Sequence, residues 1–228
     1  MAILVTRPEP GATRTANRLR AMHFSPFILP LSKTYSLAVN ESRLICDVVI
    51  ATSEAVFLHS EKNLLSKLCE KVLYCVGTRT AEAAQMAGFK NIAYIARDIF
   101  DLVQSLDCAS NTRLLYLAGR IRRPDLENML EVKFPNINIL EVYDTKPIIL
   151  NEQQKSHIPD KIEAVMLYSA MAATGLTQIE EYMNETTVLL CLSSRIANTI
   201  PKAIMSVPVV AYEPNEEAML NGLKVILG

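Results

Sequence analysis

Along the chain, short apolar runs rich in β-branched residues alternate with longer segments in which apolar residues recur at helical spacing. The short runs, bounded by polar turns, indicate buried strands, and the spaced segments indicate amphipathic helices. This alternation predicts parallel sheets, because two parallel strands need a long crossover connection, usually a helix. The expected strands cover residues 3–6, 27–30, 47–51, 72–76, 92–96, 114–118, 137–142, 164–168, 188–192 and 207–211. The expected helices cover residues 13–22, 54–60, 79–87, 99–106, 124–134, 172–182, 196–205 and 216–227.

So many strands are unusual for one open sheet, and the chain contains an internal repeat. VVIATSEAV at residues 48–56 matches AVMLYSAMA at residues 164–172. The same shift, without a gap, places LYCVGTRTA at residues 73–81 over LLCLSSRIA at residues 189–197. Two separate blocks that agree on one shift indicate two lobes of similar plan.

The repeat is circularly permuted, since YLAGR at residues 116–120 resembles ILVTR at residues 3–7. We therefore predict an α/β fold of two flavodoxin-like parallel-sheet lobes, one continuous and one assembled from both ends of the chain. The two crossing segments alternate polar and apolar residues, which predicts a two-stranded β-ladder hinge. The expected boundaries are residues 1–33 plus 148–228 for the discontinuous lobe, 38–142 for the continuous lobe, and 34–37 and 143–147 for the hinge strands.

Composition narrows the function classes. Half of the residues are hydrophobic, 21% are charged and the formal net charge is −1, so we expect neither a nucleic-acid partner nor a membrane surface. The amino terminus lacks the apolar stretch of a signal peptide, and no segment approaches the roughly 20 apolar residues of a membrane span. We expect a cytoplasmic, monomeric protein whose anionic ligands are met by locally placed groups.

The five cysteines are an odd number at scattered spacings, which favours reduced thiols over a disulfide framework. The three histidines are far apart in the sequence and fall in no metal-ligand motif, so a metal site is not expected.

Serine, threonine, glycine and arginine follow the expected strands, at the sheet edge where ligands bind in open α/β folds. Helix amino termini combined with guanidinium groups bind anions, and repetition of the pattern in both lobes favours an anionic ligand. Taken singly, each residue is better explained as an ordinary helix cap or a solvated side chain. The candidate binding residues are Arg7, Thr52, Ser53, Gly77, Thr78, Arg79, Thr80, Gly119, Arg120, Ser169, Ser194 and Arg195.

The nucleotide-binding motifs GxGxxG and GxxxxGK[ST] do not occur in the sequence, which argues against a nucleotide ligand. The motif GxSxG, which would indicate a serine nucleophile, does not occur either. GRIRRP at residues 119–124 concentrates three arginines, but without interleaved aromatic residues or overall basicity to support nucleic-acid binding. Two interpretations of this motif stay open, a substrate-facing group and a solvated one.

The chain resembles the uroporphyrinogen-III synthases over nearly its whole length. The opening ILVTRPEPGATRTANRLRAMHFSPFILPL resembles the start of that family, and further motifs follow in family order. These are IATSEAV, VGTRTAEAAQMAGF, LYLAGRIRRPDL, VYDTKP, LYSAMAATGL and LSSRIA. Each motif is weak alone, and their order and spacing carry the resemblance.

The resemblance implies two α/β lobes joined by a β-ladder, with the active site between them. It also implies a reaction in which hydroxymethylbilane, a linear tetrapyrrole bearing many carboxylates, is cyclised with inversion of ring D and loss of water. The product is uroporphyrinogen III, an intermediate of heme biosynthesis, and no metal or organic cofactor takes part. Strand-end turns that receive anions suit this polyacid substrate.

By the same resemblance, Tyr143 in VYDT matches the tyrosine proposed to assist departure of the substrate hydroxyl. Thr80 and Ser169 match hydroxyl positions of the family's cleft. The last motif departs from the family, because Ser193 to Ile196 stand where many members have Gly-Pro followed by threonine, and Arg195 is the substitute carboxylate contact. An alternative role for Tyr143 is that of a hinge residue packed between the lobes.

Two other classes of protein share the expected plan. One is a two-lobed binding or sensor module that closes on an anionic small molecule without chemistry. The other is a two-domain glycosyltransferase, although the chain is short for one and lacks a donor-binding motif. Product isomer analysis with hydroxymethylbilane and a sugar-nucleotide binding assay separate these from the enzyme.

Overall fold

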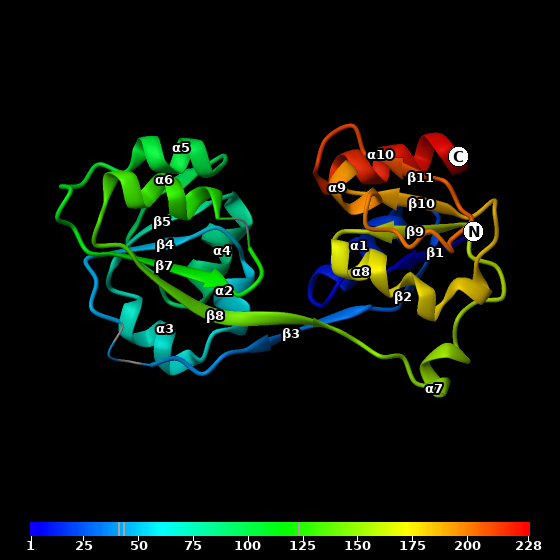
Figure 1. The fold of residues 1–228 in the computed structure, drawn as a ribbon, viewed down its shortest axis with the longest axis horizontal. Coiled ribbons are helices and arrows are strands. Elements are labelled where there is room, and N and C mark those ends of the chain that lie inside the picture. The colour runs from blue at the N-terminus through cyan, green and yellow to red at the C-terminus, as the bar shows by residue number, and fades with distance from the viewer. Residues whose placement is uncertain (41, 43, 123) are drawn as a thin grey trace. The chain divides into compact units, whose positions relative to one another are not determined.

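The computed structural model describes residues 1–40, 42, 44–122 and 124–228, and the chain divides into two compact units (Figure 1). Unit 1 comprises Met1–Lys33 and Lys146–Gly228, and unit 2 comprises Thr34–Thr145. None of the helices in these described residues is both long and apolar enough to cross a membrane.

Unit 1 contains a five-stranded parallel sheet with the spatial order β11-β10-β9-β1-β2. Numbered along this unit, the order is 2-1-3-4-5, which is the flavodoxin-like order. Its strands are β1 (Ala2–Val5), β2 (Ser25–Ile28), β9 (Ala164–Leu167), β10 (Val188–Cys191) and β11 (Pro208–Val210). Its helices are α1 (Gly11–Ala21), α7 (Glu152–Lys155), α8 (Ala170–Thr174), α9 (Ser194–Ala197) and α10 (Glu216–Leu227).

Unit 2 contains a six-stranded sheet with the order β3-β8-β7-β4-β5-β6, in which the strands from β8 to β6 are parallel. If β7 and β8 are numbered first and second, and β4, β5 and β6 follow as third to fifth, these strands also have the order 2-1-3-4-5. The two units therefore share one strand order in circularly permuted form. The strands are β3 (Ser32–Ser36), β4 (Val48–Ala51), β5 (Val72–Val76), β6 (Ile92–Ala96), β7 (Leu114–Gly119) and β8 (Asn138–Pro147). The helices are α2 (Ala55–His59), α3 (Lys62–Leu68), α4 (Thr78–Met86), α5 (Ile99–Ser105) and α6 (Asp125–Lys133).

The edge strand β3 pairs with β8, and the chain passes from one unit to the other within these two strands. Leu37 donates its amide hydrogen to the Val142 carbonyl at 3.0 Å, and the hydroxyls of Thr34 and Thr145 lie 3.1 Å apart. The residue number rises from 34 to 37 on one segment while it falls from 145 to 142 on the other, so the pairing is antiparallel. That these strands act as a hinge stays a prediction.

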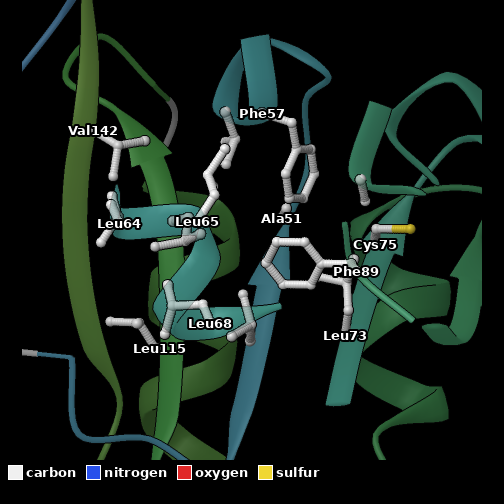
Figure 2. Close-up of a cluster of buried hydrophobic side chains, with 14 of the residues drawn as sticks. Ala51, Phe57, Leu64, Leu65, Leu68, Leu73, Cys75, Phe89, Leu115 and Val142 are labelled. Atoms are coloured by element: carbon white, nitrogen blue, oxygen red, sulfur yellow. The ribbon is translucent and has the colours of Figure 1, made fainter. Parts of the chain in front are cut away.

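Both faces of the unit 2 sheet are buried, which explains why its strands read as continuous apolar runs. On β4, Val49 and Ala51 pack under α2, α3 and α4, whereas Val48 and Ile50 pack under α5 and α6. Figure 2 shows the first of these layers, with Phe57 against Phe89 in an edge-to-face contact at 5.2 Å. The same two-layer arrangement surrounds β1 and β9 in unit 1.

The cysteines at matching places of the repeat have matching surroundings. Cys75 pairs with Ala51 across β4 and β5, and Cys191 pairs with Leu167 across β9 and β10. Both thiols are fully buried, and burial raises the pKa of each to about 11. All five cysteines are free thiols. These two are therefore neutral packing residues in the core.

The expected strands are all present, but several helix predictions were wrong in extent. The helix expected at residues 196–205 ends at Ala197, because Pro201 disfavours continuation and the Thr199 hydroxyl donates to the Ile196 carbonyl at 2.7 Å. The helix expected at 172–182 is instead α8 followed by two 3₁₀ turns, Gly175–Gln178 and Glu180–Tyr182. Helices α3 and α7 were not anticipated.

Candidate active site

Tyr143 lies on β8 beside the carboxyl end of β7, and its ring rests directly on the backbone of Gly119. A Cβ atom on Gly119 would come within 2.5 Å of the Tyr143 Cζ atom, so only glycine permits this contact. The pairing of the two strands shifts register between Ala118 and Gly119, and the Arg120 amide donates to the Tyr143 carbonyl at 2.9 Å. The backbone of β7 therefore fixes the place of the Tyr143 phenol.

The two hydroxyl residues that follow β4 each meet a tyrosine of a neighbouring strand. The hydroxyls of Thr52 and Tyr116 lie 3.0 Å apart, and Ser53 hydrogen-bonds the Tyr143 phenol. Burial raises the pKa of both phenols, although these hydrogen bonds and the nearby positive charge of Arg122 oppose the rise. Both tyrosines are therefore protonated at neutral pH and can donate hydrogen bonds.

His59, at the end of α2, is the aromatic neighbour of Tyr143. The two ring centroids lie 6.3 Å apart and the rings are tilted by 46°. Burial lowers the pKa of His59, so the imidazole is neutral at neutral pH. The phenol thus faces an uncharged ring on this side.

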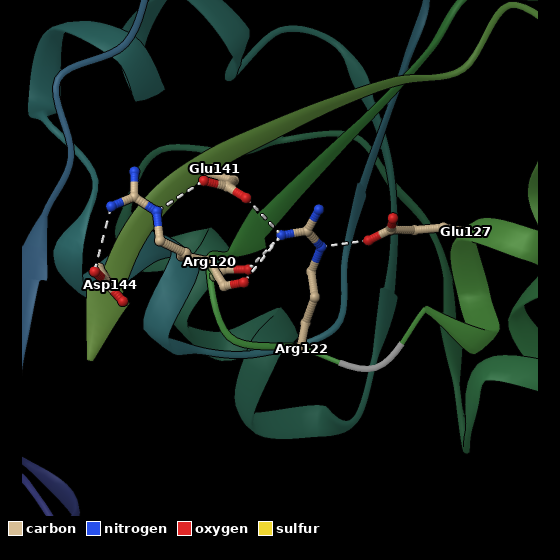
Figure 3. Close-up of polar contacts among 6 residues, drawn as sticks. Arg120, Arg122, Glu127, Glu141 and Asp144 are labelled. Carbon is tan, nitrogen blue, oxygen red and sulfur yellow. Dashed lines mark hydrogen bonds and ion pairs between the residues drawn. The ribbon is translucent and has the colours of Figure 1, made fainter. Parts of the chain in front are cut away.

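The arginines after β7 take part in an ion-pair network with three carboxylates (Figure 3). Arg120 donates to Glu141 at 3.0 Å and to Asp144 at 3.4 Å, and its side chain is half exposed. Arg122 donates to Glu141 at 2.9 Å and also pairs with Glu127. Arg120 is therefore paired but still open to solvent, whereas Arg122, with 22% of its side chain exposed, is largely shielded from it. Arg123 lies outside the described residues.

A hollow of about 490 Å³ lies beside this network, at the β3 edge of unit 2. Its lining combines the two arginines with residues from the segment after β3. The lining residues are Leu37, Ala38, Val39, Asn40, Arg120, Arg122, Ile139, Leu140 and Glu141.

The turn between β5 and α4 begins with Gly77, whose φ of +83° requires glycine. Thr78 and Arg79 are exposed in the first turn of α4, whereas the Thr80 side chain is buried. The Thr80 amide donates to the Gly77 carbonyl at 3.1 Å. The exposed first turn presents backbone amides and a guanidinium group, as an anion-binding turn requires.

In unit 1, Arg7 follows β1 and its guanidinium carbon lies 4.4 Å from the ring centre of Tyr168. Glu216, at the start of α10, is buried and pairs with Arg7 at 3.4 Å and with Arg18 at 3.5 Å. The Thr15 hydroxyl donates to the same carboxylate. Arg7 is thus held by a carboxylate from the other end of the chain.

The remaining predicted residues of unit 1 lie at two short helices. Ser169 is the N-cap of α8, and its hydroxyl accepts from the Ala172 amide at 3.2 Å. Ser194 and Arg195 are exposed in the single turn of α9. Among the described residues, no group of three histidine, cysteine, aspartate or glutamate side chains is placed to hold a metal ion.

A comparison with protein families matches residues 13–221 to the model for uroporphyrinogen-III synthase HemD. The chain belongs to the uroporphyrinogen-III synthase family. A comparison with curated proteins finds no significant match.

Solved structures of this family have the same fold. Uroporphyrinogen-III synthetase from Helicobacter pylori 26695 is 17% identical with a TM-score of 0.66, and the alignment covers 98% of this chain and 99% of that one. A mutant uroporphyrinogen III synthase from the extremely thermophilic bacterium Thermus thermophilus is 16% identical with a TM-score of 0.55, over 100% and 99% of the two chains. At such identities the likeness is one of fold, and the family match carries the function.

As a uroporphyrinogen-III synthase, the chain is a cyclising lyase of heme biosynthesis that converts hydroxymethylbilane to uroporphyrinogen III. This match decides for the enzyme against the binding module and the glycosyltransferase. The predicted fold of two parallel α/β lobes is confirmed.

Within unit 2 of this synthase, the structure brings Thr52, Ser53 and Gly119, which the strand-end pattern singles out, together with Tyr143, which the family resemblance implies. The pattern missed their partners. The unpredicted neighbours are Tyr116 and His59 in unit 2, and Tyr168 and Glu216 in unit 1; Arg122 had been noted only as part of GRIRRP. Tyr116 sits inside a strand and Glu216 far along the chain, so proximity to a strand end gave no signal for either.

Proposed function

We propose that Tyr143 is the hydrogen-bond donor to the departing hydroxyl of hydroxymethylbilane in this synthase. The observation that carries the proposal is a protonated, half-buried phenol held between Gly119 and Ser53 at the carboxyl end of a parallel sheet. Ligands bind at this end of open α/β sheets, where the phenol is near the substrate.

A weak acid is adequate for this step. Loss of the hydroxyl leaves a cation stabilised by resonance in the pyrrole, so the leaving oxygen needs only a hydrogen bond from a group that stays protonated. Tyrosine has an ordinary pKa near 10, and burial raises that of Tyr143 further. The raised pKa keeps the donor available over the whole physiological range.

The harder task is geometric, because ring D must attack through its substituted carbon, pass through a spiro intermediate and reattach in the inverted sense. The uncatalysed cation closes to the uninverted isomer instead. We propose that the enzyme acts chiefly by holding the two ends of the bilane in a near-attack arrangement. By analogy with intramolecular reactions, this arrangement lowers the activation free energy by roughly several kcal/mol.

Carboxylate binding is the means of this alignment. We propose that the exposed turn at Thr78 and Arg79, with Arg7 and Arg195, receives side-chain carboxylates of the substrate. Support comes from their positions after β5, β1 and β10 and from the affinity of guanidinium groups for carboxylates. Arg120 would have to exchange Glu141 or Asp144 for a substrate carboxylate.

The experiment is product isomer analysis with freshly generated hydroxymethylbilane. Wild-type enzyme yields the type III macrocycle, and replacement of the Tyr143 phenol by Y143F should slow turnover and raise the share of type I product. Y116F is the matched control, because it removes the other buried phenol of this edge. Unchanged turnover with pure type III product from Y143F would refute the donor role.

The expectations of a cytoplasmic location, a monomer and no nucleic-acid partner belong to this proposal. The free thiols and the net charge of −1 support them. Light scattering of the purified protein tests the monomer. The hinge role of residues 34–37 and 143–147 is likewise proposed, and a disulfide between T34C and T145C, whose native hydroxyls are 3.1 Å apart, would test it by restraining both strands.

A further inference from the structure

The loop that leaves β7 is tied back to the sheet by Arg122. From this we infer that Arg122 is a positioning residue, which fixes Gly119 under the Tyr143 ring and thereby sets the direction of the phenol. The inference rests on the proposed donor role of Tyr143.

Arg122 reaches several acceptors at once (Figure 3). Its Nη1 donates to the Gly119 carbonyl at 3.0 Å, to the Arg120 carbonyl at 3.3 Å and to the Glu141 carboxylate at 2.9 Å, while Nε donates to Glu127. These acceptors come from the end of β7, from β8 and from α6. The side chain is 22% exposed, so most of it is shielded from water.

Gly119 transmits this restraint to the phenol. A Cβ atom added to Gly119 would lie 2.5 Å from Cζ of Tyr143 and 2.8 Å from the phenol oxygen. The Gly119 backbone therefore lies under the reactive end of the ring. The Gly119 carbonyl that Arg122 holds belongs to this peptide. If the carbonyl turned away, the surface that supports the phenol would turn with it.

Arginine suits this task better than lysine would. Its planar fork offers five donors in a fixed geometry, so one side chain can hold two backbone carbonyls and two carboxylates together. Glu127 and Glu141 flank the guanidinium and keep it from swinging toward solvent. Its charge also acts on the site, because it opposes the burial that raises the pKa of Tyr143 and of Tyr116.

A double-mutant cycle tests the inference with R122Q, Y143F and the combined variant. We expect R122Q to lower kcat about tenfold, as a small misplacement of a reacting group does, and to raise the type I share with little change in KM. In the Y143F background the same replacement should cost less than about twofold, because the phenol that it positions is gone.

The outcomes separate this inference from the donor role. If Y143F is fully active, the donor role fails. If Y143F is impaired but R122Q costs as much in its presence as in its absence, the positioning role fails. An ion pair that only stabilised the fold would lower the melting temperature of R122Q and leave kcat and the isomer ratio of the folded enzyme unchanged.

R113Q is the matched control, since Arg113 precedes β7 and pairs with Asp47 at the opposite end of the same strand. It should leave kcat and the isomer ratio as in wild type. R122K keeps the positive charge but loses the planar guanidinium, and we expect it to lower kcat about threefold. It is also the milder substitution if R122Q folds poorly. Wild-type kcat and isomer ratio in R122K would overturn the inference.

Discussion

The two units are alike at the amino ends of their strands and differ at the carboxyl ends. Before β4, Asp47 accepts a hydrogen bond from the Arg113 amide at 3.1 Å; before β9, Glu163 accepts one from the Ala2 amide. In both units a carboxylate thus joins the starts of the two central strands, β4 with β7 and β9 with β1.

At the carboxyl ends the same strand order supports different contacts. In unit 2 the Tyr143 ring rests on backbone, and a guanidinium holds that backbone from the side. In unit 1 the Arg7 guanidinium itself covers the Tyr168 ring, and a buried carboxylate from α10 holds it. The repeated framework therefore determines where polar side chains emerge, while individual residues decide what they do.

The largest expected effect breaks the likeness between the two tyrosines. Y143F should lower kcat by about 10- to 100-fold, at or below the lower end of the range for a positioned proton donor, because the cation that forms is already stabilised. Y168F should stay within about twofold of wild type, since its hydroxyl is 3.5 Å from Thr15 and its ring, which faces Arg7, is kept. Turnover assays with isomer analysis decide, and equal losses in both variants would show two equivalent sites.

Glu216, the buried carboxylate of unit 1, should contribute more to stability than Glu141, the partly exposed carboxylate of unit 2. E216Q should lower the free energy of unfolding by about 1–3 kcal/mol, because Glu216 is buried and the amide has no charge to balance Arg7 and Arg18 and one acceptor oxygen fewer for these arginines and Thr15. E141Q, at a side chain 37% exposed, should cost less than about 1 kcal/mol. Urea denaturation of both variants measures the difference, and a reversed order would contradict it.

Two glycines sharpen the comparison, because a Cβ at either would collide with a neighbour. G119A would press on the Tyr143 ring and should lower kcat about tenfold. G11A would meet the end of the Arg7 side chain, which can move, so we expect a change in kcat below about threefold. In G222A, the control, the new Cβ would lie 3.8 Å from Leu190, and the variant should gain about 0.5–1 kcal/mol of stability.

The smallest effect concerns Asp47, the carboxylate that joins the starts of β4 and β7 in unit 2. Hydrogen bonds from the Arg113 side chain and backbone lower the pKa of Asp47 to about 2. Its contribution to stability is therefore present above the unfolded value of about 4 and is lost as the pH falls toward 2. D47N should be less stable than wild type at pH 7, and the difference should shrink between pH 4 and pH 2 in thermal melts. A constant difference across that range would show that ionisation of Asp47 contributes nothing.

The sequence by itself determined the fold to a large extent. Continuous apolar runs such as residues 48–51 follow from burial on both sheet faces, and the permuted repeat showed that the chain contains two sheets before any strand order was known. Helix ends were less predictable, because a proline and side-chain hydrogen bonds stop α9 after one turn. Helix α3 has a readable signal in the spacing of Leu64, Leu65 and Leu68.

Only the tertiary structure decided which polar residues act together. Sequence position places a side chain at the end of a strand, but a hydrogen bond depends on distances of a few tenths of an ångström between segments far apart in the chain. Tyr116 reaches Thr52 across 64 residues, and Glu216 reaches Thr15 across 201. The permuted strand order brings such segments together, but the repeat in the sequence does not say which of their side chains meet.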